Sequence, residues 1–280
     1  MSMHDARHDR GPAPREHNGD THETHDGHEA PRAPGHLARE TTPPELRPEG
    51  AARRDVGVII VAAGSGTRTG GRELKQFRWV AGKPMLLHSI QAFHRRADVA
   101  QVVAVLPRSV AGDPPPWIFQ CDVDRLLVSV GGAQRGDSVW SGIEDLEDEV
   151  EIVVVHDAAR PLVTDATIEA VIAQARRGTG AIAALPVVDT LKEVSEDGTI
   201  VRTVDRTKLW RAQTPQAFPR EMLERAHLDA RRAGVNATDD AALCERLGFP
   251  VVVVQGSERA MKVTEERDFA RADAIAGLEG

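Results

Sequence analysis

Hydrophobic residues along this chain fall into short runs, separated by segments with helical periodicity. The run at 56–62 is apolar throughout, which is typical of a strand buried on both faces of a sheet. Shorter runs predict further strands at 101–106, 126–130, 151–155, 181–186, 251–254 and 260–263. Helices are predicted between and after them at 84–96, 134–146, 164–176, 220–233, 239–247 and 264–275. The alternation predicts a Rossmann-like α/β fold, in which a mostly parallel sheet carries helices on both faces.

Residues 189–206 interrupt this alternation. Two stretches with strand character, 191–194 and 199–204, flank Asp197 and Gly198. Asp-Gly is a favoured pair for a tight hairpin turn. We therefore expect a β-hairpin arm inserted into the α/β domain, and arms of this kind often mediate contacts between subunits.

The first 54 residues differ in composition from the rest of the 280-residue chain. They hold 7 of the 11 histidines and 7 of the 17 prolines, with almost no aliphatic residue to bury. Such a segment cannot offset the entropy lost on ordering, so we expect a disordered tail over 1–54 and a folded domain over 55–280. The histidines also leave open a metal-binding tail or a start codon assigned too far upstream. They are His4, His8, His17, His22, His25, His28 and His36.

Composition and charge exclude several classes of protein. The net charge is −8 at pH 7, and the chain has 6 Phe, 4 Trp and no Tyr. This argues against nucleic-acid binding, because the chain has no global basic field and few aromatic residues on which bases could stack. No apolar run is long enough to span a bilayer, and no apolar signal segment is visible. Cys121 and Cys244 have no metal-binding or redox spacing. We expect a cytoplasmic protein without a membrane or nucleic-acid partner.

A glycine-rich loop at 62–71 follows the first strand, where backbone N–H groups can approach phosphates. A dinucleotide-binding fingerprint would need a third glycine after Gly64 and Gly66, but that position is Thr69. A Walker A loop would need Lys-Ser or Lys-Thr after its second glycine, and Arg72 stands there, followed by glutamate. Both standard phosphate-loop interpretations therefore fail.

Arg68 and Lys75 place two cations beside this loop. That arrangement suits a nucleoside triphosphate attacked at its α-phosphorus while pyrophosphate departs, because charge grows on the phosphate oxygens. Taken alone, each cation could equally be a solvated loop charge.

Polar clusters follow other predicted strands, and ligands of such sheets bind at the carboxyl ends of the strands. One cluster is GGAQRGDS at 131–138, and another is HDAARP at 156–161. In the second cluster, Asp157 is well placed to hold Mg²⁺ against phosphate oxygens. Later hydroxyls, carboxylates and cations lie at 189–190, 205–206, 214–216, 238–240 and 262–264.

With these motifs, the sequence resembles the 2-C-methyl-D-erythritol 4-phosphate cytidylyltransferases of the non-mevalonate isoprenoid pathway. The resemblance covers about 56–275. Its carriers occur in the family's order: AAGSGTRTGG, LKQF, GGAQRGDSV, VHDAARP, VVDTLKEV, TVDRTKLW, AQTPQAF, TDDA and MKVT. It implies a nucleotidyltransferase fold, CTP and a sugar-alcohol phosphate as substrates, Mg²⁺ as cofactor, and a homodimer whose hairpin arms interlock.

The resemblance also implies roles for individual residues. Arg68 and Lys75 would stabilise the transition state, and Arg206 and Lys262 would position the sugar phosphate, with Arg206 acting on the neighbouring subunit's site. Asp157 would bind both metal and substrate. The sugar-phosphate pocket would be lined by Arg160, Thr190, Thr214 and Thr238. The nucleotide would be held by Ala62, Ala63, Gly64, Gly66, Gly131, Gly132 and Ser138.

Two positions depart from the family pattern. Leu74 stands where the family usually has proline, which would rigidify the approach to Lys75. Thr69 stands where methionine is common. Two alternatives also remain open, a cytidylyltransferase for another sugar-alcohol phosphate such as ribitol 5-phosphate, and a non-catalytic nucleotide-binding protein on the same fold.

Overall fold

The computed structural model of the protein describes residues 53–64 and 74–279. The chain divides into Met1–Glu49 and Gly50–Gly280, and the second unit carries every element below. The predicted disordered tail therefore lies outside the described residues, apart from Arg53 and Arg54. Arg53 forms an ion pair with Glu151 and lies 3.6 Å from Asp55, so the folded unit makes contacts from Arg53 onward.

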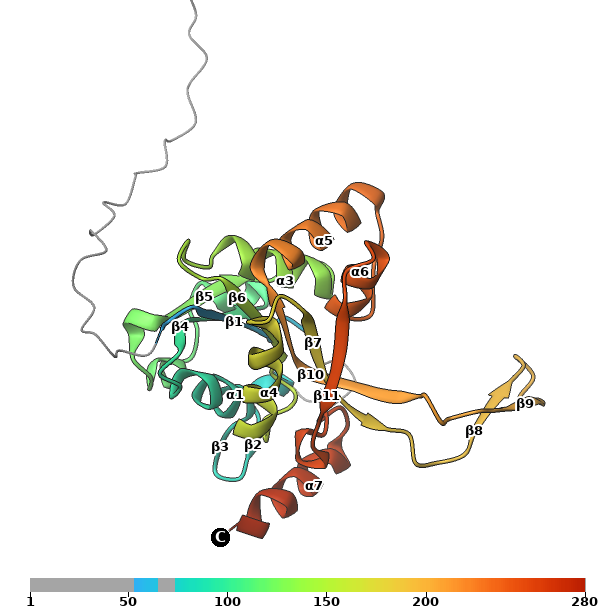
Figure 1. Cartoon of the computed structure of the whole chain (residues 1–280). Coiled ribbons are helices and arrows are strands. Elements are labelled where there is room, and N and C mark those ends of the chain that lie inside the picture. Colours follow the sequence, from blue (N-terminus) through green and yellow to red (C-terminus); the bar gives the residue numbers. More distant parts are fainter. Residues whose placement is uncertain (1–52, 65–73, 280) are drawn as a thin grey trace, which may run out of the picture. The chain divides into compact units, whose positions relative to one another are not determined.

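A seven-stranded sheet forms the centre of the described chain, in the order β11-β7-β10-β6-β1-β4-β5 (Figure 1). Every neighbouring pair is parallel except those of β10, which runs antiparallel to β6 and β7. The predicted mostly parallel sheet is confirmed. Its strands are β1 (Val56–Val61), β4 (Val99–Leu106), β5 (Leu126–Val130), β6 (Ile152–Asp157), β7 (Gly180–Pro186), β10 (Trp210–Pro219) and β11 (Val251–Gln255).

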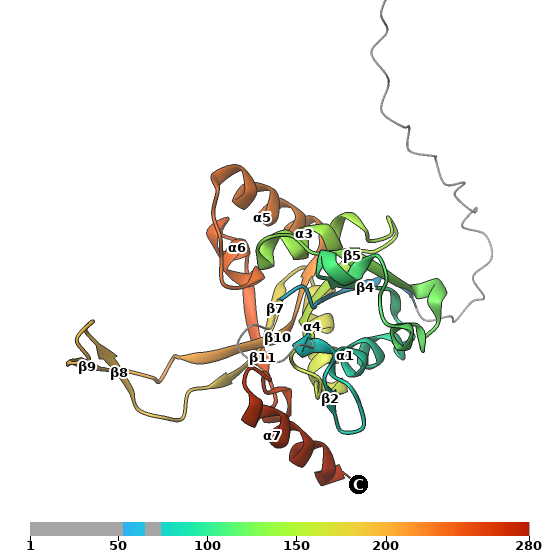
Figure 2. The same ribbon diagram turned by 180° about the vertical axis from the view of Figure 1, so that it is seen from behind.

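Helices cover both faces of this sheet (Figure 2). One face carries α1 (Met85–His94) and α4 (Asp165–Ala175), and the other carries α3 (Arg135–Glu144), α5 (Arg220–Ala233) and α6 (Asp240–Arg246). Successive residues of β1 point to opposite faces, so Ile60 packs in one core and Ile59 in the other. Among the described helices, none is both long and apolar enough to cross a membrane.

Shorter elements complete the described chain. They are β2 (Trp79–Val80), β3 (Lys83–Pro84), α2 (Arg108–Ala111), α7 (Glu266–Ala276) and the 3₁₀ helices Lys75–Phe77, Pro116–Phe119, Val123–Arg125, Glu258–Ala260 and Gly277–Glu279. Helix starts follow the cap residues in the sequence. Thr164 caps α4, with its hydroxyl accepting from the Thr167 N–H at 3.3 Å. Gln134 and Asp137 form a capping box at α3.

The predicted hairpin arm is present. β8 (Leu191–Val194) and β9 (Ile200–Val204) pair antiparallel, and Gly198 occupies the turn with a φ of +83°. The arm extends away from the central sheet (Figure 1). It is joined to the sheet through β7 and β10 at its base.

Two predictions differ from the structure. The strand expected at 260–263 is wrong: Glu258–Ala260 is a 3₁₀ helix, and 261–264 has no regular secondary structure. The antiparallel strand β10 was not predicted at all. It contains Pro215 and several buried polar residues, and its pairing with β7 shifts register between Ala212 and Gln216. Hydrophobic alternation is lost over the run Gln-Thr-Pro-Gln at 213–216, so the pattern does not indicate a strand.

Candidate active site

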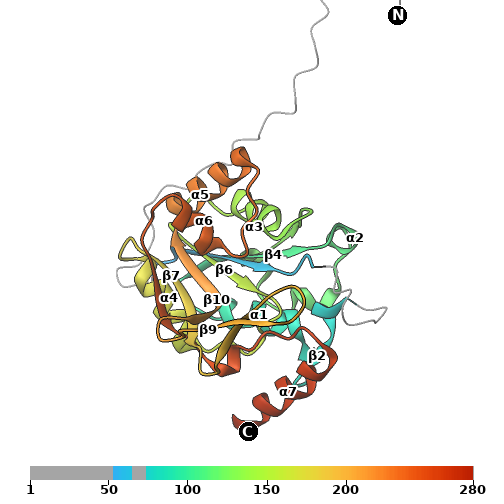
Figure 3. The same cartoon turned by 90° about the vertical axis from the view of Figure 1, so that its right-hand side faces the viewer.

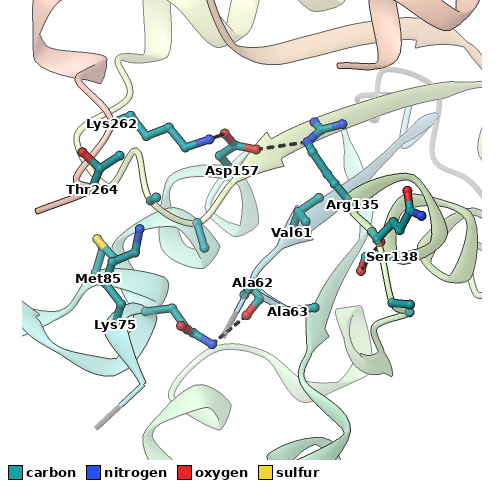
Figure 4. Close-up of a pocket in the computed structure, with 17 residues that line it drawn as sticks. Val61, Ala62, Ala63, Lys75, Met85, Arg135, Ser138, Asp157, Lys262 and Thr264 are labelled. Atoms are coloured by element: carbon teal, nitrogen blue, oxygen red, sulfur yellow. Dashed lines mark hydrogen bonds and ion pairs between the residues drawn. The ribbon is translucent and has the colours of Figure 1, made fainter. Parts of the chain in front are cut away.

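A cavity of about 510 Å³ lies at the carboxyl ends of β1, β5 and β6 (Figure 4). The loop after β1, the turn after β5 and the HDAARP segment at the end of β6 all contribute to it. This is the edge of a parallel sheet at which ligands bind, and the volume falls in the range of small-molecule sites.

Eight of the residues predicted from the sequence line this cavity: Ala62, Ala63, Gly64, Lys75, Gly132, Ser138, Asp157 and Lys262. They come from chain segments as far apart in sequence as Ala62 and Lys262. Gly66 and Arg68 lie outside the described residues. The structure therefore brings most of the described nucleotide-binding candidates into one place.

The backbone after β1 is held firmly on both sides. The Ala62 N–H donates to Val105 O at 2.9 Å, and the Gln76 side-chain amide donates to Ala62 O at 2.7 Å. Gln76 is itself buried. Because these bonds occupy the main-chain groups of Ala62, the loop that follows starts from a fixed point.

Gly131 lies behind the residues that line the cavity, at the point where the turn after β5 approaches the loop after β1. A Cβ on Gly131 would lie 2.2 Å from Ala63 Cβ and 3.0 Å from Ser138 Oγ. Its N–H donates to Leu106 O at 2.8 Å. The turn after β5 therefore packs directly on the loop after β1, which only a residue without a side chain allows.

A row of alternating charges crosses the cavity (Figure 4). Lys262 Nζ donates to Asp157 Oδ2 at 2.6 Å, and Arg135 Nε lies 3.6 Å from Asp157 Oδ1. Burial by itself would raise the pKa of Asp157, but Lys262 and Arg135 outweigh it and hold that pKa at about 2. The carboxylate is therefore ionised at neutral pH, between two cations.

Behind Arg135 lies a second, fully buried carboxylate, Asp240. Arg135 Nη1 lies 2.8 Å from Asp240 Oδ2 and forms an ion pair with it. His227 Nε2 lies 3.0 Å from the other oxygen of Asp240. Burial opposes ionisation of Asp240, yet Arg135 and His227 keep its pKa below the usual range. The ion pair with Asp240 orients the Arg135 guanidinium from the side away from the cavity.

The main chain of Asp157 is also held in place. Its N–H donates to the Thr214 hydroxyl at 3.0 Å, and that hydroxyl lies 3.2 Å from His156 Nδ1. His156 Nε2 lies 3.1 Å from the Arg160 carbonyl, which can only accept. Burial lowers the pKa of His156 to about 4, so the ring is neutral and Nδ1 accepts from Thr214. Thr214 thus fixes the end of β6 and does not line the cavity.

The segment that carries Lys262 is held by side chains and loops in place of a strand ladder. The Val263 N–H donates to Ala159 O at 2.8 Å, and Lys75 Nζ donates to Val263 O at 2.8 Å. Arg160 Nη1 donates to Ala260 O at 2.7 Å. Held in this way, the segment contributes both Lys262 and Thr264 to the lining of the cavity.

Several predicted residues lie elsewhere. Arg160, Thr190, Thr214, Thr238 and Arg206 are absent from the cavity lining. Arg206 is exposed at the base of the hairpin arm, where it donates to Val188 O. Thr190 is exposed beside it, and Thr238 is exposed before α6. The described chain therefore does not bring these five side chains to the cavity.

The cavity also contains residues to which the sequence assigned no role, chiefly Gln76, Arg135 and Thr264. Each lies inside one of the motifs that carry the family resemblance, LKQF, GGAQRGDSV or MKVT. Their position next to a predicted site residue was the available signal. The ion pairs that orient Arg135 depend on Asp240, more than 100 residues away, and sequence spacing cannot show them.

No group of three or more His, Cys, Asp or Glu side chains is arranged to hold a metal ion within residues 53–64 and 74–279. Asp157 supplies a single ionised carboxylate to the cavity. One or two carboxylates together with substrate phosphates are the usual environment of Mg²⁺, so this donor fits a metal held mainly by a polyphosphate.

Comparisons with known proteins agree on one family. The family model for 2-C-methyl-D-erythritol 4-phosphate cytidylyltransferase matches residues 56–277. The chain is similar to the protein of that name from Desulforamulus reducens, with 41% identity over 78% of this chain and 94% of the relative. It is also similar to the one from Syntrophus aciditrophicus, with 40% identity over 78% of this chain and 94% of the relative.

A solved structure extends the agreement to three dimensions. The crystal structure of 2-C-methyl-D-erythritol 4-phosphate cytidylyltransferase from Thermus thermophilus superposes with a TM-score of 0.68 and 36% identity. The match covers 80% of this chain and 99% of that chain. The family predicted from the ordered motifs is confirmed, and the chain belongs to the 2-C-methyl-D-erythritol 4-phosphate cytidylyltransferase family.

Proposed function

We propose that the protein transfers a cytidylyl group from CTP to 2-C-methyl-D-erythritol 4-phosphate. An oxygen of the sugar phosphate attacks the α-phosphorus of CTP, the bond from that phosphorus to the β-phosphate oxygen breaks, and pyrophosphate leaves. The products are 4-diphosphocytidyl-2-C-methyl-D-erythritol and pyrophosphate. The observation that carries this proposal is the charged cavity at the carboxyl ends of β1, β5 and β6, found in a chain of this family.

The cations of the cavity suit the charge that such a transfer develops. Lys75, Arg135 and Lys262 all line it, against the single carboxylate of Asp157 among the described lining residues. Two anionic substrates meet in the reaction, and charge accumulates on the departing pyrophosphate. Fixed cations in a partly enclosed site stabilise that charge without reorganising at the moment of reaction. Lys75 is half-buried and already oriented by its bond to Val263 O.

The nucleotide would lie along the main chain that the glycines expose. Ala63, Gly64 and Gly132 line the cavity with short side chains or none, and Ser138 presents a hydroxyl at the start of α3. Ser138 Oγ lies 3.2 Å from Gln134 O, so its orientation is set by the helix itself. These groups would contact the base and ribose, leaving the triphosphate to the cations.

A divalent cation is part of this proposal. Asp157 would hold Mg²⁺, whose bound charge would partly neutralise the phosphates of CTP. With a pKa of about 2, the Asp157 carboxylate is available as a ligand throughout the physiological range. Lys262 and Arg135 keep the same carboxylate oriented toward the cavity.

We further propose a homodimer formed through the hairpin arm, with a cytoplasmic location, where CTP is available. The arm exposes β-branched side chains that water disfavours: Val194, Ile200 and Val201 are 55–60% exposed. Arg206 and Thr190 lie at its base, so pairing of arms would bring them toward a neighbouring subunit's cavity. Sedimentation should give a dimer, and Ile200→Glu should shift it toward the 30.3 kDa monomer. Val123→Glu, which changes an equally exposed valine away from the arm, should not.

The activity itself is tested by pyrophosphate release with Mg²⁺ and a substrate panel. CTP should be preferred over ATP, GTP and UTP, and 2-C-methyl-D-erythritol 4-phosphate over ribitol 5-phosphate. Faster turnover of ribitol 5-phosphate would replace the proposed acceptor. Pyrophosphate release from no combination would favour a nucleotide-binding protein without catalysis.

A further inference from the structure

Two segments that carry cavity cations continue into elements that pack on each other outside the cavity. Lys75 lies in the 3₁₀ helix that leads into β2, and Lys262 precedes α7. β2 and α7 lie side by side in the views of Figures 1 and 3. A small buried cluster joins them, formed by Val80, Met85, Val263, Phe269 and Ala272. The segments that carry Lys75 and Lys262 are therefore supported by the same buried cluster.

Arg78 connects the β2 segment directly to α7. Its Nη1 and Nη2 donate to Glu266 Oε2 and Oε1 at 2.6 and 2.7 Å, a bidentate pair. Its guanidinium carbon also lies 3.9 Å from the centroid of the Phe269 ring. We name these three side chains the Arg78 clamp. Arginine suits this place because a planar guanidinium can stack and form a bidentate pair at once, which lysine cannot do.

The clamp is tied to both cavity segments through the main chain. The Arg78 N–H donates to Lys75 O at 3.2 Å, closing the 3₁₀ turn. On the other side, Glu266 follows Thr264 by two residues, and Thr264 lines the cavity. A second bond, from the Ala81 N–H to Asp273 Oδ1 at 2.8 Å, holds the far end of α7 to the β2–β3 turn.

Arg78 does not line the cavity, so any effect on the reaction must pass through other residues. The connection is short, because Lys75 Nζ donates to the carbonyl of Val263, the residue between Lys262 and Thr264. If α7 moved relative to β2, this bond and the spacing of the two ammonium groups would change together. A displacement of about 1 Å in a catalytic group can reduce a rate about a hundredfold.

We propose that Arg78 is a positioning residue for cytidylyl transfer, which fixes the separation of Lys75 and Lys262 by holding α7 against the β2 segment. This inference rests on the function proposed above for the cavity. It predicts that loss of the clamp lowers kcat more than it raises KM for CTP, because Lys75 and Lys262 act most strongly on charge that develops in the transition state.

The test is a double-mutant cycle on kcat with Arg78→Ala, Glu266→Ala and both together. Each single variant should lower kcat roughly tenfold, and the double variant should lose no more than the worse single one, because one interaction is removed in all three. Glu266 is largely exposed, so Glu266→Ala carries the test even if Arg78→Ala fails to fold. Arg95→Ala is the matched control: it removes an exposed pair with Asp165 away from the cavity and should leave kcat unchanged.

Hydrogen exchange on the same proteins separates this inference from the proposed function. Peptides covering 261–276 should exchange faster in Arg78→Ala and Glu266→Ala than in wild type or Arg95→Ala. Three results would each contradict the proposed role of Arg78. They are wild-type kcat in both single variants, additive losses in the double variant, and unchanged exchange at 261–276. A wild-type enzyme without turnover of CTP would contradict the proposed function instead, and the exchange data would still decide the positioning role.

Discussion

Gly131→Ala is the substitution whose cost follows most directly from the structure. The new Cβ would lie 2.2 Å from Ala63 Cβ, whereas two carbons normally approach to about 3.5–4.0 Å. It would also lie 3.0 Å from Ser138 Oγ and 3.3 Å from Leu106 O. The φ of Gly131 is not positive, so the effect is one of space and not of backbone strain.

The crowded groups cannot move apart freely. Gly131 is bonded to Leu106 O, and Ala62 is held by Val105 and Gln76. Overpacking of this kind costs about 1–3 kcal/mol of the free energy of unfolding. If the loop after β1 yields instead, the affinity for CTP should fall about tenfold, since about 1.4 kcal/mol corresponds to a factor of ten.

Urea unfolding and calorimetric CTP titration measure both consequences. Gly136→Ala is the control, because nothing lies within 4 Å of a Cβ there and alanine is favoured in a helix by about 0.5–1 kcal/mol. Ala63→Gly combined with Gly131→Ala removes the closest contact and should recover most of the loss. Wild-type stability together with wild-type CTP affinity in Gly131→Ala would refute the reasoning.

Three further predictions concern the cavity, its support and the tail. Lys75→Met should lower kcat by about 10²–10³, as for loss of a transition-state charge contact. Lys83→Met, which changes a lysine outside the cavity lining, should keep kcat near the wild-type value. Equal kcat values in the two variants would remove Lys75 from the mechanism. His156 is neutral when folded, with a pKa of about 4, so stability present above pH 6.5 should fall by up to roughly 3 kcal/mol as the pH drops toward 4. Thermal unfolding of His156→Gln should show a smaller loss, and an identical pH profile would contradict this. Deleting residues 1–52 should change kcat by less than about twofold, and a larger loss in a steady-state assay would give the tail a role.

Most of the fold is predictable from the sequence, because most of its strands are apparent from the local pattern of hydrophobic residues. Each parallel strand is a short apolar run, and Thr164 marks the start of α4 through its own hydroxyl. β10 escaped prediction because tertiary contacts, not alternation, make it a strand: Gln216 is buried and bonded to Asp239 and to the Ala241 N–H. A polar residue satisfied by distant partners gives no local signal.

The same limit applies to the site. Lys75, Asp157 and Lys262 were found because they belong to ordered motifs, and the structure brings them to one cavity. Arg135 was visible in a motif but received no role, since its orientation depends on Asp240 in α6. The segment before α7 has strand-like composition, yet side chains take its carbonyls, so no ladder forms. Such outcomes depend on residues that meet only in the folded chain.

The most direct measurement of the central claim is ³¹P NMR of the full-length protein with CTP, Mg²⁺ and 2-C-methyl-D-erythritol 4-phosphate. The account predicts that the sugar-phosphate monoester signal disappears as a cytidine diphosphate ester and pyrophosphate appear in equal amounts, and that Lys75→Met forms both far more slowly. An unchanged monoester signal with intact CTP at high enzyme concentration would contradict it.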